Sequence, residues 1–350
     1  MSAPYLSIVA ASRNDNHGGN TLQRMKLFVN GLIVQANRHQ LPVELVMVEW
    51  NPPENQPLLQ DVLPKPQPGD LLTINYIVVP RTVHEQYKRS SEIPLFQMIA
   101  KNVGIRRAKG EFILCTNIDL LFSDPLFRLL ASRELRCDFF YRANRCDVPN
   151  EIDSESRVDE QLAWCAKNVI RRLGMDARFT NINLEQLGMN HRSDYQKWLL
   201  DKFAIALQLL WAPEKVRYYQ LDSFACGDFT LMSREAWFKI RGYAELDLYS
   251  IHVDTLGLIS AASMGYQQHI FPREACTYHL DHEQGWSTMT PVDKIRFLVE
   301  RPGLDYGLVV EAGLAALQRK EPLPLNSANW GFADQQFAEY SFPHNESASA

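Results

Sequence analysis

The sequence predicts an α/β fold with a mainly parallel central sheet flanked by helices. Strand-like and helix-like segments alternate from the N-terminal region to Thr116, which is the pattern of consecutive βαβ units. The strand-like segments are continuously apolar instead of alternating between apolar and polar residues. Such strands are expected to be buried on both faces, as in a parallel sheet covered by helices.

The expected elements are found in order along the chain. Strands are predicted at 5–11, 43–49, 71–79, 111–116 and 224–232, and a short strand pair at 268–271 and 275–280. Helices are predicted at 21–39, 95–107, 233–242, 253–264, 293–300 and 306–319. Asn20 precedes the first of these helices and is a residue type suited to an N-cap.

Two segments depart from this pattern. The stretch at about 142–221 is charged, rich in helix formers and without clear strands, which predicts a helical insertion beside the site or a structural appendage. Beyond Lys320, proline, asparagine, serine and alanine dominate. Residues 321–350 are therefore expected to form a loosely ordered C-terminal tail.

The composition excludes several classes of protein. With 46% hydrophobic and 22% charged residues the chain is an ordinary globular protein, and a net charge of -5 argues against a nucleic-acid partner. Strand-like sequence begins almost at once, which leaves no room for a signal peptide, and no apolar run approaches the ~20 residues of a membrane helix. The six cysteines form no CxxC pair, so we expect reduced, mostly buried thiols and a cytoplasmic protein.

The tripeptide Asn117-Ile118-Asp119 follows directly on the predicted strand at 111–116. In open α/β sheets the carboxyl edge is where ligands bind. A carboxylate at this edge is suited to hold a divalent cation, which in turn holds a diphosphate. The alternative is an ordinary Asn/Asp turn that ends the strand.

Two further features belong to the same edge. The polar loop that follows the first strand contains Ser12, Arg13 and Asn14, and backbone amides at the start of the next helix could meet an anion there. A simple βα turn is the alternative. Glu49 ends the second strand and could accept hydrogen bonds from a nucleobase or a ribose hydroxyl. The chain has no GxGxxG after its first strand and no GxxxxGK[ST], which argues against dinucleotide-binding and P-loop domains.

The segment at 101–114 carries a family resemblance. It reads KNVGIRRAKGEFIL and leads into Asn117-Ile118-Asp119, and here the chain resembles the GT-A nucleotide-sugar glycosyltransferases of the family 2-like group. In that family an Arg-Asn-x-Gly helix and Ala-x-Gly-Glu precede a strand that ends in the metal-binding DxD. Lys101 stands in place of the arginine, ahead of Asn102, and Asn117 replaces the first carboxylate. The resemblance therefore leaves Asp119 as the main metal ligand.

The resemblance continues through the second half of the chain. Residues 227–235, GDFTLMSRE, are similar to the family's Gly-rich strand, beginning at Gly227, and a Gly-Tyr turn follows. Asp254 stands at the start of a helix, where the family places its general base. An inverting transfer needs such a carboxylate to remove the proton of the acceptor hydroxyl. An aspartate that caps a helix is the alternative.

The last motif is YHLDHEQGW at 278–286. Imidazole is a good ligand for an Mn²⁺-type ion beside a carboxylate, and several GT-A enzymes use a late histidine in this way. His279 and His282 are therefore candidate metal ligands, with a slight preference for His279. Trp286 is expected in a loop that closes over the donor and excludes water.

Taken as a whole, the resemblance implies one GT-A domain over residues 1–320. It implies a metal-dependent, inverting glycosyltransferase that uses Mn²⁺ or Mg²⁺ and a nucleotide-diphosphate sugar, UDP-linked before GDP-linked. The acceptor would be a glycan, a lipid-linked or another hydroxyl, and contact with a membrane surface stays open. The expected donor-binding residues are Ser12, Arg13, Asn14, Glu49, Lys101, Asn102, Asn117, Gly227 and Trp286. The alternatives are a GT-A-like binding or scaffold protein without catalysis, and a sugar nucleotidyltransferase.

Overall fold

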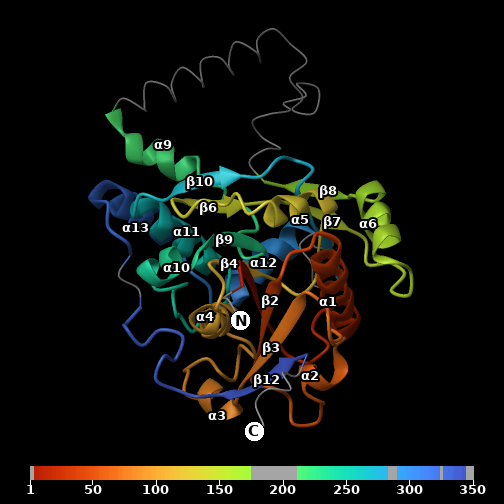
Figure 1. The fold of residues 1–350 in the computed structure, drawn as a ribbon. Coiled ribbons are helices and arrows are strands. Elements are labelled where there is room, and N and C mark those ends of the chain that lie inside the picture. The colour runs from red at the N-terminus through yellow and green to blue at the C-terminus, as the bar shows by residue number, and fades with distance from the viewer. Residues whose placement is uncertain (1–3, 175–210, 283–289, 324–325, 344–350) are drawn as a thin grey trace.

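The computed structural model describes residues 4–174, 211–282, 290–323 and 326–343 (Figure 1). Its main sheet has eight strands, which in spatial order are β10 (Gln267–Ile270), β6 (Phe139–Arg142), β9 (Phe229–Ser233), β4 (Phe112–Thr116), β1 (Leu6–Ser12), β2 (Val43–Trp50), β3 (Leu72–Val79) and β12 (Ala338–Phe342). Strands β1 to β4 are parallel, whereas β9 and β12 run antiparallel to their neighbours. The predicted fold class, an α/β fold with a mainly parallel central sheet, is confirmed.

Helices cover both faces of this sheet (Figure 1). They are α1 (Thr21–Arg38), α2 (Leu59–Val62), α3 (Arg81–His84), α4 (Gln97–Arg107), α5 (Asp124–Ala131), α6 (Val158–Lys167), α9 (Pro213–Tyr219), α10 (Arg234–Ile240), α11 (Val253–Ser263), α12 (Pro291–Glu300) and α13 (Tyr306–Arg319). Successive residues of one strand enter different cores. Val9 packs with the α4 and α11 side, and Ile8 with the α1 side. Burial on both faces explains the continuous apolar character of the strands.

A second, four-stranded sheet consists of β5 (Leu120–Phe122), β11 (Cys276–Leu280), β7 (Asn144–Val148) and β8 (Arg171–Leu173), in this order. Strand β5 follows closely on β4 in the chain, so the acidic tripeptide lies where the main sheet passes into the second one. Strand β11 is antiparallel to β5 and parallel to β7. The second sheet therefore brings three distant parts of the chain to the end of β4.

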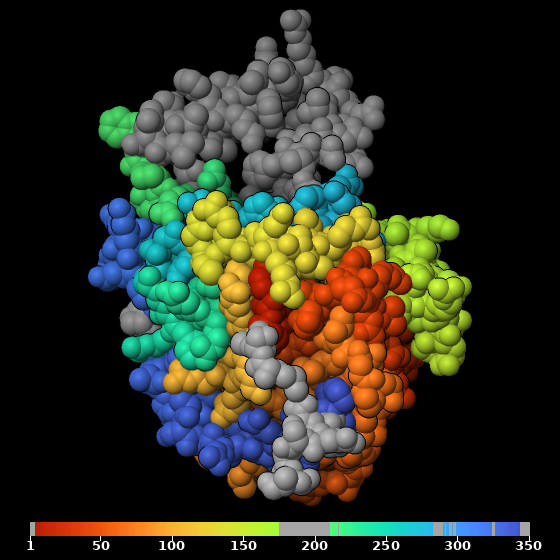
Figure 2. Space-filling model, in the orientation of Figure 1, coloured from red at the N-terminus to blue at the C-terminus, as the bar shows by residue number. Residues whose placement is uncertain are grey.

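The prediction of a loosely ordered tail is wrong for the described part of residues 321–350. Trp330 is 2% exposed, and β12 pairs with β3 along its whole length. In Figure 2 this segment, in blue, lies against the lower end of the molecule. The aromatic residues Trp330, Phe332 and Phe337 supply the apolar surface that the polar composition of the tail concealed.

Three other expectations need correction. Residues 142–221 are not solely helical, because β7 and β8 lie there beside α6 and α9, while residues 175–210 are outside the described part. The strands of the predicted pair at 268–280, β10 and β11, lie in different sheets. Asn20 occupies the N-cap position of α1, but its backbone is left-handed and its side chain makes no capping hydrogen bond.

Two expectations about composition also have structural counterparts. Five of the six cysteines are buried free thiols, and Cys137 is exposed, in agreement with the expected thiols. In the described part of the chain, no helix combines the length and the apolar character that crossing a membrane requires.

Candidate functional site

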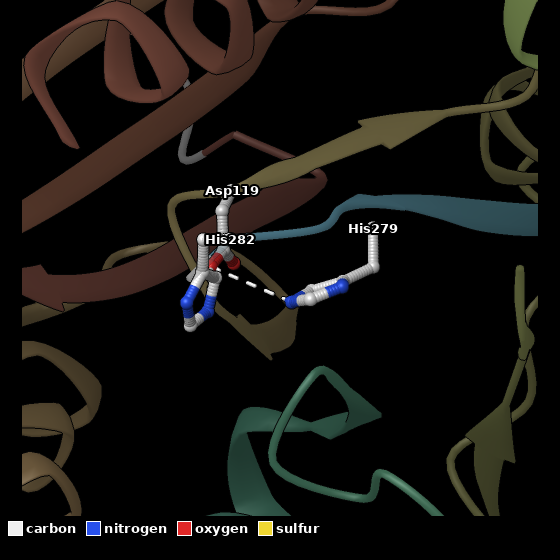
Figure 3. A group of neighbouring side chains, drawn as sticks. All are labelled: Asp119, His279 and His282. Carbon is white, nitrogen blue, oxygen red and sulfur yellow. Dashed lines mark ion pairs between the residues drawn. The ribbon is translucent and has the colours of Figure 1, made fainter. Parts of the chain in front are cut away.

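Asp119 lies between β4 and β5, and its side chain meets two histidines from the far end of the chain. The backbone N–H of Leu280 donates to the carbonyl of Asp119 at 2.9 Å, which brings the end of β11 alongside it. His279 Nε2 is 3.6 Å and His282 Nε2 is 3.7 Å from Asp119 Oδ2. Figure 3 shows the three side chains turned toward one another. We call Asp119, His279 and His282 the cation group; it is the only potential metal-binding trio found among the described residues.

His282 reaches this group from the loop and not from the strand. Residues three positions apart on a strand point to opposite faces, so His279 and His282 could not converge if β11 continued. The strand ends at Leu280, so His282 lies beyond it. Gly18, with φ of +68°, permits the close approach of the first loop, because a Cβ there would lie 2.7 Å from His282 Nδ1.

The cation group fits a divalent metal ion. Asp119 Oδ1 and His282 Nδ1 are buried and have no hydrogen-bond partner within the described part of the chain. An unsatisfied buried polar atom is costly unless a ligand or water completes it. One carboxylate and two imidazoles are also the donor set that manganese-type ions accept.

Arg24 is a residue of this site that the sequence analysis missed. It is 1% exposed, and its Nη1 donates to Asp119 Oδ2 at 3.0 Å. Its Nη2 donates to the carbonyls of His17 at 2.6 Å and Gly19 at 3.1 Å. Arg24 thus ties the first loop to the carboxylate. The available signal was a basic residue in the first turn of a helix, where the helix dipole disfavours a cation.

The environment sets the charge of two members of the cation group. Burial acts to raise the pKa of Asp119, but His279, Arg24 and His282 outweigh it and hold this pKa well below its usual range. Burial lowers the pKa of His282 to about 4, against the attraction of Asp119. Near neutral pH Asp119 is therefore a carboxylate and His282 a neutral imidazole, the forms that bind metal ions, whereas His279 must release its proton to bind one.

The third member, His279, is held from behind by β7. Asp147 is fully buried, and its Oδ1 lies 3.3 Å from His279 Nδ1. Burial and Arg145 act to lower the pKa of His279, but Asp119 and Asp147 raise it to about 9. A carboxylate behind a metal-binding imidazole fixes the ring orientation. Asp147 and Arg145 were missed, although the polar residues in 144–148 were a signal.

Asp254, the predicted base, lies in the first turn of α11. Its Oδ1 accepts from the backbone N–H of Thr255 at 2.9 Å. Burial raises its pKa, against Cys226 and Lys101, which lower it. Gly227 leaves room for the carboxylate, since a Cβ there would lie 2.9 Å from Asp254 Oδ2. A carboxylate with a raised pKa is a stronger base than an ordinary aspartate.

The predicted nucleoside side contains an open hollow of about 420 Å³ at the carboxyl ends of β1 and β2. Arg13 and Asn14 line it, together with Asp15, Asn16, Pro53, Glu54, Asn55 and Gln56. Ser12, the last residue of β1, is buried beside the loop. Trp286 lies outside the described residues.

Three other predicted donor-binding residues are fully buried and bond within the protein. Glu49 Oε2 accepts from the backbone N–H of Leu59 at 2.8 Å, which anchors the Pro-rich loop, while its Oε1 is buried without a partner in the described part of the chain. Lys101 donates to Asn117 Oδ1 and to the carbonyl of Gly227, both at 2.8 Å.

Asn102, the third of them, braces the turn after α10. Its Nδ2 donates to the Tyr243 carbonyl at 2.8 Å and to Glu245 Oε1 at 3.1 Å, and its Oδ1 accepts from the Tyr243 N–H at 2.8 Å. In this structure Asn102 therefore supports the site from inside the protein. The family motif does not distinguish a supporting residue from one that contacts the donor.

Comparisons with known proteins give a likeness of fold only. No family model matches the chain, and no match was found among curated proteins. Among solved structures, residues 1–349 of S. aureus TarS are similar, with a TM-score of 0.44, 14% identity, and coverage of 91% of this chain and 71% of that chain. The same fragment in complex with UDP-GlcNAc gives 0.44, 14%, 91% and 72%, and S. aureus TarS gives 0.40, 12%, 91% and 43%. No residue role follows from so distant a likeness.

Proposed function

We propose that this chain is a glycosyltransferase that moves a sugar from a nucleotide-diphosphate sugar to an acceptor hydroxyl. The observation that carries the proposal is the cation group at the carboxyl edge of the sheet, with Asp119 Oδ1 buried and unpartnered within the described chain. The open hollow at the ends of β1 and β2 occupies the neighbouring part of this edge. In open α/β sheets this edge is where ligands bind.

Asp119, His279 and His282 would hold the divalent cation, Mn²⁺ or Mg²⁺. Such a cation neutralises the diphosphate and stabilises the charge that develops on the leaving nucleotide. The protein supplies the fixed frame around it. Arg24 holds Asp119 Oδ2, and Asp147 fixes the ring of His279 from behind.

Asp254 would act as the general base of an inverting transfer. Its carboxylate accepts the proton of the acceptor hydroxyl while the hydroxyl oxygen attacks C1 of the donor sugar. Burial raises the pKa of Asp254, which strengthens it as a base. We propose a UDP-sugar before a GDP-sugar as donor, with the nucleoside in the hollow beside Arg13 and Asn14.

The test is a donor panel with the purified chain. UDP- and GDP-sugars are incubated with Mn²⁺, and release of the nucleoside diphosphate and thermal stabilisation are measured. We expect release and stabilisation with at least one donor, both lost on chelation of the metal. If no nucleoside diphosphate were released and no nucleotide caused a thermal shift, the proposed glycosyltransferase activity would be refuted.

One observation favours a second candidate, a GT-A-like binding protein without catalysis. Asn117 replaces a carboxylate, and Arg24 already pairs with Asp119 at 3.0 Å, which reduces the negative charge available to a metal ion. Binding of a nucleotide sugar without turnover would favour this candidate. A sugar nucleotidyltransferase would instead release pyrophosphate from a nucleoside triphosphate and a sugar phosphate.

A further inference from the structure

Asn117 forms hydrogen bonds within the protein through both its amide oxygen and its amide nitrogen. Its Oδ1 accepts from Gln97 Nε2 and from Lys101 Nζ, both at 2.8 Å. Its Nδ2 donates to Asp228 Oδ1 at 2.5 Å. An ammonium group only donates and a carboxylate only accepts, so these neighbours determine the orientation of the amide. Asn117 is therefore a link between two charged side chains.

Asp228 carries this link to the second sheet. It is 4% exposed, and its Oδ2 accepts from Arg145 Nη1 at 2.7 Å. Arg145 Nε donates to Asp147 Oδ1 at 2.6 Å, and the same oxygen lies 3.3 Å from His279 Nδ1, which donates to it when Nε2 faces a metal ion. Charge-assisted hydrogen bonds of this kind hold side chains more firmly than neutral ones.

Together these contacts form a polar bridge, which we define as Lys101, Asn117, Asp228, Arg145, Asp147 and His279. At one end, Lys101 Nζ donates to the carbonyl of Gly227, the glycine whose Cα faces the proposed base. At the other end, His279 belongs to the cation group. The bridge therefore spans from the side of the base to the side of the metal.

We propose that Asp228 and Arg145 are positioning residues for the transfer reaction, and that Asp228 is the reason why position 117 carries an asparagine. The inference rests on the proposed function, because it concerns the alignment of that site. Asp228 and Arg145 act through His279 and Asn117 and need not contact the substrate.

The charge pattern of the bridge explains the asparagine. With an aspartate at position 117, two carboxylate oxygens would lie at the 2.5 Å that now separates Asn117 Nδ2 from Asp228 Oδ1. Two buried like charges at this distance cannot both stay ionised. One of the two carboxyl groups must therefore take up a proton in Asn117→Asp, which removes a negative charge from beside Lys101 or Arg145, or a repulsion results if both stay charged.

Asp228→Asn alone also breaks the bridge. In this variant the amide oxygen at position 228 must accept from Arg145. The NH₂ group at position 228 then faces the NH₂ group of Asn117, and neither can accept a hydrogen bond. Exchanging the two side chains retains every bond. The amide at position 228 then donates to the carboxylate at 117, which still accepts from Lys101, while the amide oxygen still accepts from Arg145.

The experiment compares the wild type with Asn117→Asp, Asp228→Asn and the double variant. Three quantities are measured: the free energy of unfolding, the dissociation constant of Mn²⁺ in the presence of UDP by electron paramagnetic resonance, and kcat and KM with the active donor. Asp138→Asn is the matched control, since Asp138 also pairs with an arginine, Arg136, but is solvent-exposed directly before β6.

We expect each single variant to weaken Mn²⁺ binding in the presence of UDP by about 10-fold or more and to lower kcat more than it raises KM, as loss of residues behind a metal site does. The double variant should recover to within about 3-fold of the wild type, because the two changes are coupled through one contact. The control should match the wild type.

A double variant in which the two defects simply add, in Mn²⁺ binding or in kcat, would overturn the proposal. So would single variants that lose stability while Mn²⁺ binding and kcat stay unchanged, because the bridge would then be structural only. Binding of Mn²⁺ and UDP without sugar transfer by the wild type would refute the proposed function, whereas the binding cycle would still decide the role of the bridge.

Discussion

Two sets of buried polar residues at the same edge of the sheet differ in how their hydrogen bonds are completed. In the cation group, Asp119 Oδ1 and His282 Nδ1 have no partner in the described part of the protein. On helix α4, Lys101 and Asn102 are fully buried, and their polar groups bond to neighbouring residues.

This difference separates residues that await a ligand from residues that hold the frame. An unsatisfied buried atom costs free energy, so a protein retains one mainly where a ligand completes it. A fully bonded buried residue has no remaining capacity for a ligand. The motif resemblance places Lys101, Asn102 and Asp119 in one binding site. The hydrogen bonds instead assign Asp119 to the residues that await a ligand, and Lys101 and Asn102 to the residues that hold the frame.

The largest effect is expected for Asp119→Asn. The amide oxygen can still accept from Arg24, but this buried guanidinium loses its counter-charge, so the metal-free variant should lose up to about 3–5 kcal/mol of stability. The lost charge should weaken the binding of Mn²⁺ with UDP and lower kcat by about 100-fold or more, since metal stabilisation of the leaving group contributes several kcal/mol. Calorimetric titration and steady-state kinetics measure both. If the Asp119→Asn variant kept its activity, Asp119 would not be a metal ligand, and an unpaired buried atom would no longer identify a ligand-binding residue.

The next effect is expected at the base. Gly227→Ala places a methyl group 2.9 Å from Asp254 Oδ2 and displaces the carboxylate. A displacement of about 1 Å can cost up to about 100-fold in kcat. Gly303→Ala is the control, because the nearest atom to its Cβ is the carbonyl oxygen of Arg301, at 3.8 Å. Equal kcat for the two variants would exclude Asp254 as the base.

The sequence predicts those parts of the site that follow from an edge rule or from the family resemblance. Asp119 belongs to the tripeptide that directly follows an apolar strand, so its position at the carboxyl edge of the sheet is predictable from the sequence. His279 was found through the late histidine of the family. Both lie in the same group in the structure.

The missed residues depend on tertiary packing. Arg24 and Asp147 are charged side chains within a helix and a strand, and only their burial shows that they need partners. The tail was misjudged for a related reason, since one buried tryptophan, Trp330, and one strand pairing outweigh its polar composition. Local patterns do not contain these long-range contacts.

A moderate effect on stability is expected for the residues that hold the frame. Asn102→Ala removes the partners of the Tyr243 N–H and carbonyl groups. Leaving such buried groups unpaired should lower the free energy of unfolding by about 2–3 kcal/mol. Denaturant unfolding measures this change. The folded variant should bind Mn²⁺ and UDP like the wild type; weaker binding with unchanged stability would assign Asn102 to the ligand instead.

The smallest effect concerns pH and Glu49, a buried residue between the two sets, whose Oε2 accepts from Leu59 while its Oε1 has no partner in the described part of the chain. Burial raises its pKa from 4.5 to about 7, although the N–H of Leu59 opposes the shift. Between about pH 4.5 and 7 the folded protein therefore binds more protons than the unfolded chain. This group makes the free energy of unfolding fall as pH rises through that window.

Glu49→Gln should remove this contribution, because the glutamine oxygen still accepts from Leu59 and carries no charge. The free energy of unfolding, measured in denaturant at pH 5 and pH 7.5, should then fall less with rising pH in the variant than in the wild type. Binding of UDP should be unaffected, since the side chain faces the interior. If Glu49→Gln instead weakened UDP binding with an unchanged pH profile, Glu49 would contact the nucleoside. It would then belong to the residues that await a ligand.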